Sequence, residues 1–216
     1  MMSTNKAARG RPQTLDREKL LGIAVSSYWT DGTESVSVND ICRRAGISKP
    51  GLYREFQNED GLKSAALEAY REKHLVPMYT ILGKNQSFLE ALEEIVEFFN
   101  RKHRYQSRQE CPEGCLHADM NHSRTVYGPS TLETIDSLNV KIEMELKSWF
   151  DHRKAAGEIR ETMETASAVT YLFAQFSGAL NLRKKGVGSE EVEKFLRLGF
   201  SVFLKSEGGE CEINNE

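Results

Sequence analysis

Apolar residues recur along this chain at steps of three and four, and this spacing restricts its fold more than any other feature. Such steps keep side chains on one face of an α-helix, whereas a half-buried strand needs strict alternation. Val, Ile and Thr are nowhere concentrated in alternating runs of strand length. The chain has 216 residues, 39% of them hydrophobic, which is enough for one large domain or two smaller ones. We therefore expect an all-α protein with a packed core.

Charge is distributed unevenly between the two ends of the chain. Residues 1–54 carry 9 basic and 5 acidic side chains, whereas residues 55–216 carry 20 and 27. The formal net charge of −3 excludes a general polyanion binder, but a basic N-terminal part can still meet phosphate. No apolar leader segment is visible, and the longest uncharged stretch, residues 165–182, is too polar to span a bilayer. We expect a cytoplasmic protein that does not bind membranes.

Capping residues and glycines divide the chain into helices. Thr14 is expected to cap the first helix, Ser37 and Ser48 the second and third, and Asn58 the fourth, which should stop before Pro77. The expected helices span about 14–31, 37–45, 48–56, 58–74 and 87–104, a short helix from 115, then 130–156, 162–185 and 189–205.

Residues 37–56 have the pattern of two short helices joined by a tight turn at Gly46, which is the helix-turn-helix arrangement. Leu52 and Phe56 are placed to anchor the second helix from beneath. The outer face of that helix is then compact, basic and aromatic, which suits the major groove of duplex DNA. Its N-terminal N–H groups can also point at phosphate. This outer face consists of Lys49, Pro50, Gly51, Tyr53 and Arg54.

Residues 14–63 resemble the DNA-binding domain of the TetR/AcrR family of transcriptional regulators. The resemblance rests on Tyr28 before Asp31-Gly32, on the runs 36–41, 45–49 and 52–56, and on Leu62. It implies a ligand-responsive regulator, a repressor rather than an activator, that binds palindromic operator DNA as a homodimer. It also implies a helix-turn-helix domain (14–63) and a larger helical effector-binding and dimerisation domain (64–206). From their polar composition, we expect residues 1–13 to form a flexible basic arm and residues 207–216 a disordered tail.

The resemblance further implies which residues contact DNA, with the Tyr53 hydroxyl on a phosphate. Glu55 and Glu59 depart from the family pattern, because His or Tyr and Lys are common at these positions, and Lys63 is expected to offset them in part. A helical interaction protein that has lost DNA binding therefore stays open as an alternative. The expected contact set is Ser37, Arg43, Arg44, Ser48, Lys49, Pro50, Gly51, Tyr53, Arg54 and Lys63, with Arg9 and Arg11 reaching an adjacent groove.

The expected helix 162–185 is uncharged on most of its faces, so that it must be covered all round. The expected helix 189–205 repeats Val192, Phe195, Leu196, Gly199 and Phe203 on one face. A four-helix interface across a two-fold axis would cover them, and burial within one subunit is the alternative. A small-molecule effector pocket is expected in the same half of the chain, although aromatic and Met residues at helical spacing are more often core. Its candidate lining is Met78, Phe98, Phe99, His103, Met120, Tyr127, Met144 and Phe173.

Cys111 and Cys115 are candidate redox thiols, because a thiol at a helix N-terminus can react with oxidants or electrophiles. A thiol-sensing regulator is therefore a further alternative. With Asp119 and His122 the same cysteines could form a soft metal site, but their spacing is not that of a usual zinc knuckle. A structural role is the simplest interpretation, so we expect no metal and no cofactor. The sequence also lacks the common catalytic motifs, which argues against an enzyme.

Overall fold

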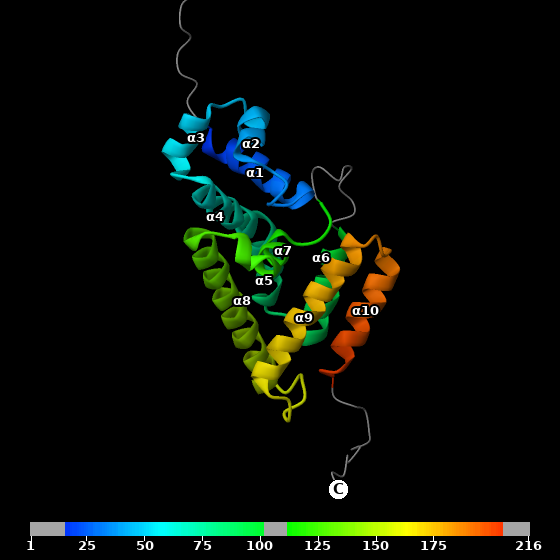
Figure 1. Ribbon diagram of the computed structural model, residues 1–216. Helices are drawn as coiled ribbons and strands as arrows, with labels where there is room; N and C mark the ends of the chain where they lie inside the picture. Colours follow the sequence, from blue (N-terminus) through cyan, green and yellow to red (C-terminus); the bar gives the residue numbers. More distant parts are fainter. Residues whose placement is uncertain (1–15, 102–111, 205–216) are drawn as a thin grey trace, which may run out of the picture.

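Every regular element in the part of the chain that the computed structural model describes, residues 16–101 and 112–204, is a helix. Figure 1 shows a small group of helices at one end, and α4 leads from it into a larger group. The small group is α1 (Arg17–Asp31), α2 (Val38–Ala45) and α3 (Lys49–Phe56), followed by α4 (Glu59–Tyr70). The larger group is α5 (Val76–Leu82), α6 (Phe88–Arg101), α7 (Leu116–His122), α8 (Pro129–Ala155), α9 (Thr165–Lys184) and α10 (Ser189–Ser201). The all-α fold is confirmed.

Most helix ends lie where the capping residues predicted them. The side chains of Ser37, Ser48 and Asn58 accept hydrogen bonds from the backbone at the starts of α2, α3 and α4. Gly46 closes α2 in the left-handed conformation, with φ 68°. The predicted cap of α1 is wrong: Asp16 caps it by accepting the N–H of Lys19 at 3.0 Å. A carboxylate three residues before Lys19 reaches this N–H, and Thr14 lies outside the described residues.

The helix that starts at Asn58 does not stop before Pro77, contrary to the sequence prediction. A π-helical turn, η1 (Arg71–Leu75), links α4 to α5, and Pro77 lies in the first turn of α5. A π-helical turn pairs each N–H with a carbonyl five residues back, which changes the hydrogen-bonding register. Proline is tolerated in a first turn because no N–H is needed there. The chain therefore passes Pro77 without leaving the helical path.

Two hydrophobic clusters form the core, and α8 contributes to both. The first joins α1–α4 to α7 and to the start of α8, through Ile135 and Leu138. The second joins α5, α6, α9 and α10 to the rest of α8, through Ile142, Leu146 and Phe150. The helix-turn-helix group is thus packed against the larger group through a continuous apolar contact.

The remaining differences concern the ends of elements. α6 starts at Phe88, α9 at Thr165 and α10 ends at Ser201, each within a few residues of the expected bounds. The expected arm (1–13) and tail (207–216) lie outside the described residues. None of the described helices is both long enough and apolar enough to cross a lipid bilayer.

Candidate nucleic-acid interface and adjoining pocket

α3 is held against the other N-terminal helices from one side only. Leu52 is fully buried and Phe56 nearly so, and both belong to the first hydrophobic cluster. The side-chain oxygen of Ser48 accepts the N–H of Gly51 at 3.3 Å and so caps the helix. The predicted anchors and cap are therefore present. The opposite side of α3 presents the exposed Lys49, Pro50 and Arg54 and the half-buried Gly51 and Tyr53.

The outer face of α3 is compact and positively charged. The Nζ atom of Lys49 lies 5.4 Å from the ring centroid of Tyr53, which is a cation–π distance. A Cβ atom at Gly51 would lie 3.2 Å from Oγ of Ser48, so that a larger residue would press on the cap. The small residue leaves the N-terminal N–H groups of α3 accessible. This face can therefore approach a phosphate backbone closely.

α2 adds a second capped N-terminus beside α3. The Ser37 side chain accepts the N–H of Asp40 at 3.2 Å, and Asp40 accepts the N–H of Ser37 at 3.2 Å, which completes the predicted capping box. Hydrogen bonds from the Ser37 hydroxyl and from the Ser37 backbone hold the pKa of Asp40 below its usual value. Arg43 is exposed and pairs with Asp40 at 2.6 Å. Ser37 and Arg43 thus lie at the surface, within one polar cluster.

Two of the predicted contact residues are engaged elsewhere. Arg44 donates to the Ser27 hydroxyl at 2.7 Å and pairs with Asp31 at 2.9 Å, which ties α2 to α1. The side chain of Lys63 is only 12% exposed and pairs with Glu59 at 2.8 Å. That Arg44 and Lys63 contact DNA stays a prediction. To reach a phosphate, each side chain would have to leave its carboxylate partner.

The two unusual acids beside α3 have cationic partners. Glu55 pairs with Arg17 at 3.0 Å, and Glu59 pairs with Lys63. Each pair places a positive charge next to the negative one, so that the field of the carboxylate is reduced at a distance. The expected weakening of DNA attraction by these acids is therefore smaller than their charges alone would indicate.

Polar contacts connect this N-terminal group to the start of α8. The backbone N–H groups of Ser130 and Thr131 donate to the carboxylate of Asp60 at 2.8 and 3.4 Å, so that a residue of α4 caps α8. The hydroxyls of Thr33 and Tyr127 share a buried hydrogen bond of 2.6 Å. These contacts fasten the start of α8 to α4, and Tyr127 just before it to the turn after α1.

We expect Asp60→Asn to destabilise the protein by about 1 kcal/mol at pH 7, because the amide carries no charge toward the N-terminus of α8. Burial raises the pKa of Asp60, but hydrogen bonds from Thr131, Ser130 and Gly128 outweigh it and leave the pKa lowered. The contribution of Asp60 is therefore present above about pH 4 and is lost as the pH falls further. Urea unfolding at several pH values measures it. A Glu133→Gln control on the exposed face of α8 should change stability by less than about 0.5 kcal/mol.

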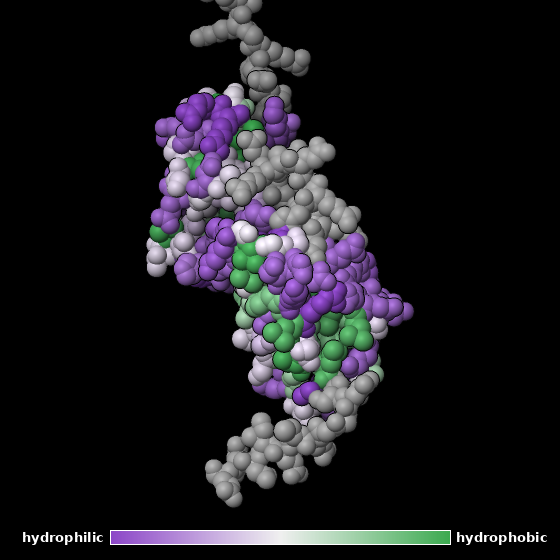
Figure 2. Space-filling model, turned by 90° about the vertical axis from the view of Figure 1, so that its right-hand side faces the viewer, coloured by the Kyte–Doolittle hydropathy of each residue, from purple (hydrophilic) through white to green (hydrophobic). Residues whose placement is uncertain are grey.

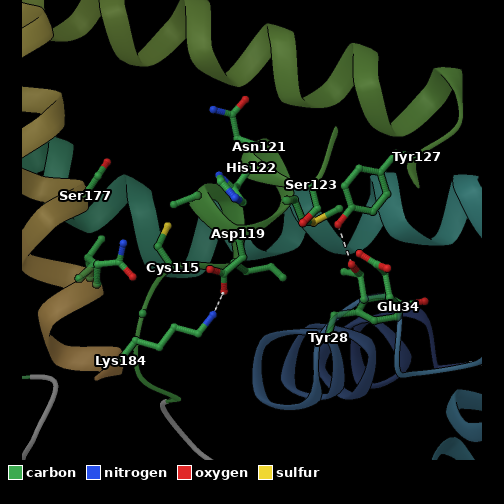
Figure 3. Close-up of a pocket in the computed structure, with 18 of the residues that line it drawn as sticks. Tyr28, Glu34, Cys115, Asp119, Asn121, His122, Ser123, Tyr127, Ser177 and Lys184 are labelled. Atoms are coloured by element: carbon green, nitrogen blue, oxygen red, sulfur yellow. Dashed lines mark hydrogen bonds and ion pairs between the residues drawn. The ribbon is translucent and has the colours of Figure 1, made fainter. Parts of the chain in front are cut away.

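An open pocket of about 900 Å³ lies between the turn after α1, α7 and α9. Figure 3 shows side chains from all three segments directed into it, with Lys184 bonded to Asp119 across it at 2.9 Å. Tyr28 lines the pocket, and its hydroxyl is buried without a hydrogen-bond partner in the described residues. Burial raises the pKa of Tyr28, so the hydroxyl stays neutral. The wall therefore combines hydrogen-bonding groups with apolar surface.

The structure brings together only some of the predicted effector residues. Met120, Tyr127 and Phe173 line the pocket. Met78 and Phe99 are instead buried in the second hydrophobic cluster, and Phe98 packs against it. Met144 is 66% exposed on the outside of α8, because its position in that helix faces away from α4 and α9. His103 lies outside the described residues.

Cys115 is the N-cap residue of α7 and is 6% exposed, at the edge of this pocket. Cys111 lies outside the described residues, so a role for the pair as redox thiols stays a prediction. Asp119 is engaged by Lys184. In the described ranges no three His, Cys, Asp or Glu side chains are grouped in a way that could hold a metal ion.

Sequence reasoning missed several lining residues of the pocket. Tyr28, Thr33 and Glu34 belong to the N-terminal group, where no effector contact was expected. Lys184 meets Asp119 across 65 positions of sequence, and nothing local marks such a pair. Polar residues within the uncharged stretch of α9, such as Ser177 and Asn181, were a signal that could have found part of this lining.

Comparison with known proteins agrees with this arrangement. The family profile of "Bacterial regulatory proteins, tetR family" matches residues 20–66, which include α2 and α3. The chain is 25% identical over 190 residues to the HTH-type transcriptional repressor ComR of Escherichia coli (strain K12), covering 87% of this chain and 88% of that protein.

Solved structures show the same fold over nearly the whole chain. A regulatory protein TetR from Rhodobacter sphaeroides superposes with a TM-score of 0.77 at 16% identity, covering 88% of this chain and all of that one. A cysteine-substituted variant of the TetR-family regulator CifR, solved with 26-base-pair operator DNA, gives a TM-score of 0.73 at 21% identity, over 90% of this chain and all of that one. The helix-turn-helix signature, the family profile and the shared fold agree: the chain is a member of the TetR family of transcriptional regulators.

Proposed function

We propose that this protein is a ligand-responsive transcriptional repressor that binds palindromic operator DNA through α3. The main support for this proposal is the outer face of α3, which is exposed, basic and capped at its N-terminus. This face lies within the residues that match the family profile. ComR is named a repressor, and CifR was solved on operator DNA, which supports the same activity here. An interaction protein without DNA binding is not favoured, since the acids that suggested it are paired with cations.

The proposal is tested by footprinting the purified protein on the DNA that flanks its own gene, followed by gel shift over a range of salt concentrations. We expect one protected palindrome whose affinity falls steeply with salt, because phosphate contacts release counterions. The absence of binding to any palindrome at low salt would contradict the proposal.

A homodimer through α9 and α10 would present α3 twice. Figure 2 looks onto the side that carries α9 and α10, and hydrophobic residues gather on its lower half. Leu198 on α10 is 74% exposed, and Val202, directly after α10, is 39% exposed. The half-buried Gly178 of α9 lets Phe195 pack closely. A two-fold axis beside these helices would set the two α3 helices about 34 Å apart, one turn of DNA.

We expect Leu198→Glu to convert the dimer into a monomer and to weaken operator binding, because it places two charges in an apolar interface across the two-fold axis. Sedimentation velocity measures the first effect and gel shift the second. Leu89 on α6 is a matched control, since it is also apolar and 56% exposed. Leu89→Glu should leave the dimer intact. A Leu198→Glu protein that stays dimeric would place the interface elsewhere.

We infer that the effector occupies the pocket between the turn after α1, α7 and α9. Its apolar wall, with Met120 and Phe173, and its polar side chains, with Ser177 and Asn181, suit a small amphipathic molecule that carries a hydrogen-bonding group. An occupant contacts the N-terminal group and α9 together. Ligand binding can therefore favour a conformer with a different separation of the two α3 helices, which couples the two sites by population shift.

A further inference from the structure

A second pocket, of about 460 Å³, lies where the turn between α9 and α10 meets the end of α1. Figure 1 shows that turn at the end of the larger helical group that faces α1. Trp29 and Thr30 line the pocket from α1, and Arg183 and Ser189 line it from α9 and α10. This pocket is separate from the proposed effector pocket, although Lys184 lines both.

Arg183 is the unusual residue of this pocket, because its guanidinium is buried with few partners. The residue is 4% exposed. Its Nη1 donates to the Ser189 hydroxyl at 3.0 Å, and its Nε lies 3.7 Å from a carboxylate oxygen of Glu113. Its Nη2 is fully buried and has no hydrogen-bond partner in the described chain. Burial lowers the pKa of the Arg183 guanidinium.

A buried guanidinium normally binds a carboxylate or a phosphate through two parallel hydrogen bonds. The single long contact with Glu113 leaves this capacity largely unused. The 13-residue helix α10 starts here as well, and no side chain hydrogen-bonds its first N–H groups at the N-cap Gly188. These features all favour a negatively charged occupant.

Carboxylates also border the pocket and restrict what it can bind. Glu113 competes for the same guanidinium, and Glu191 lies close to Gly188, since a Cβ atom there would be 2.8 Å from its carboxylate. An occupant must therefore be small, and it must compete with Glu113 for the part of the Arg183 guanidinium that lines the pocket. A compact oxyanion group meets both conditions, whereas a large polyanion does not.

We propose that this pocket binds a small oxyanion, a carboxylate or a phosphate group, on Arg183 and the Ser189 hydroxyl at the start of α10. Because Trp29 and Thr30 belong to α1, the bound anion joins the helix-turn-helix group to the α9–α10 turn. Binding of the anion then also affects the position of α3, and it does so separately from binding of the amphipathic effector. The binding step itself does not depend on the proposed operator binding.

The test is thermal unfolding and calorimetric titration of the full chain with inorganic phosphate and with acetate, against sodium chloride of equal ionic strength. We expect a saturable rise in Tm with at least one oxyanion, and the more effective probe identifies the preferred group. Arg183→Gln and Ser189→Ala should each weaken its binding at least tenfold. Lys185→Gln is the matched control, since Lys185 is exposed and lines neither pocket.

Equal responses to phosphate, acetate and chloride would overturn the proposal. So would an oxyanion response that persists in both pocket variants, or one that is lost in Lys49→Ala instead, because the anion would then lie on α3. If Arg183→Gln does not fold, Ser189→Ala decides alone, because removing one hydroxyl leaves the guanidinium and the helix in place.

Discussion

Replacing Lys49 and Tyr53 together with alanine is expected to lower the operator affinity of the dimer by about 100-fold or more. Both residues stand on the outer face of α3, and the two-fold dimer carries each change twice. A single lost contact of this kind costs about 1–3 kcal/mol. The salt dependence should fall too, with a slope reduced by about 1 for each lysine that no longer meets a phosphate.

The fold should survive this double substitution, because Lys49 is exposed and Tyr53 is only half-buried, packed at the edge of the first hydrophobic cluster. Circular dichroism and the oligomeric state check this. Lys147→Ala is the matched control: Lys147 is also exposed but lies on α8, away from α3, and its removal should leave the affinity within about twofold. Unchanged operator binding in the double variant would mean that α3 does not carry recognition.

The parts of the fold that depend on neighbouring residues could be predicted from the sequence. Ser37 and Ser48 cap helices because an oxygen at the N-cap reaches an N–H only three residues on. Gly46 closes α2 because a left-handed residue is needed there. The anchoring of α3 by Leu52 and Phe56 follows from their spacing. The candidate DNA-binding face depends mainly on contacts between residues close in sequence, so most of it could be predicted.

The contacts that join the two groups of helices could not be predicted in this way. Asp60 meets Ser130 across 70 positions, and Thr33 meets Tyr127 across 94. Nothing in the local pattern distinguishes these residues from ordinary surface Asp and Thr. The continuation of the helical path past Pro77 was missed for a related reason. The π-helical turn η1 before Pro77 changes the hydrogen-bonding register, so that the proline falls in the first turn of α5. The effector pocket depends on such contacts, and so only part of its lining was predicted.

Gly61 is a position where one methyl group should disturb both stability and recognition. A Cβ atom there would lie 2.1 Å from the backbone carbonyl oxygen of Phe56, the last residue of α3. A flexible side chain could move aside, but a backbone carbonyl at the end of a helix cannot do so unless the junction between α3 and α4 opens. The opening would also displace the anchor Phe56, and with it the outer face of α3.

We therefore expect Gly61→Ala to destabilise the protein by about 3 kcal/mol and to weaken operator binding at least tenfold, as measured by urea unfolding and gel shift. Gly22→Ala is the matched control, because Gly22 lies within α1 and a Cβ there would meet nothing within 4 Å. That change should stabilise the protein by about 0.5–1 kcal/mol, since alanine favours a helix more than glycine does. The two substitutions add the same methyl group, so effects of opposite sign isolate the contact with Phe56. Effects of equal sign and size would show that the close packing of α3 on α4 is not what positions the recognition helix.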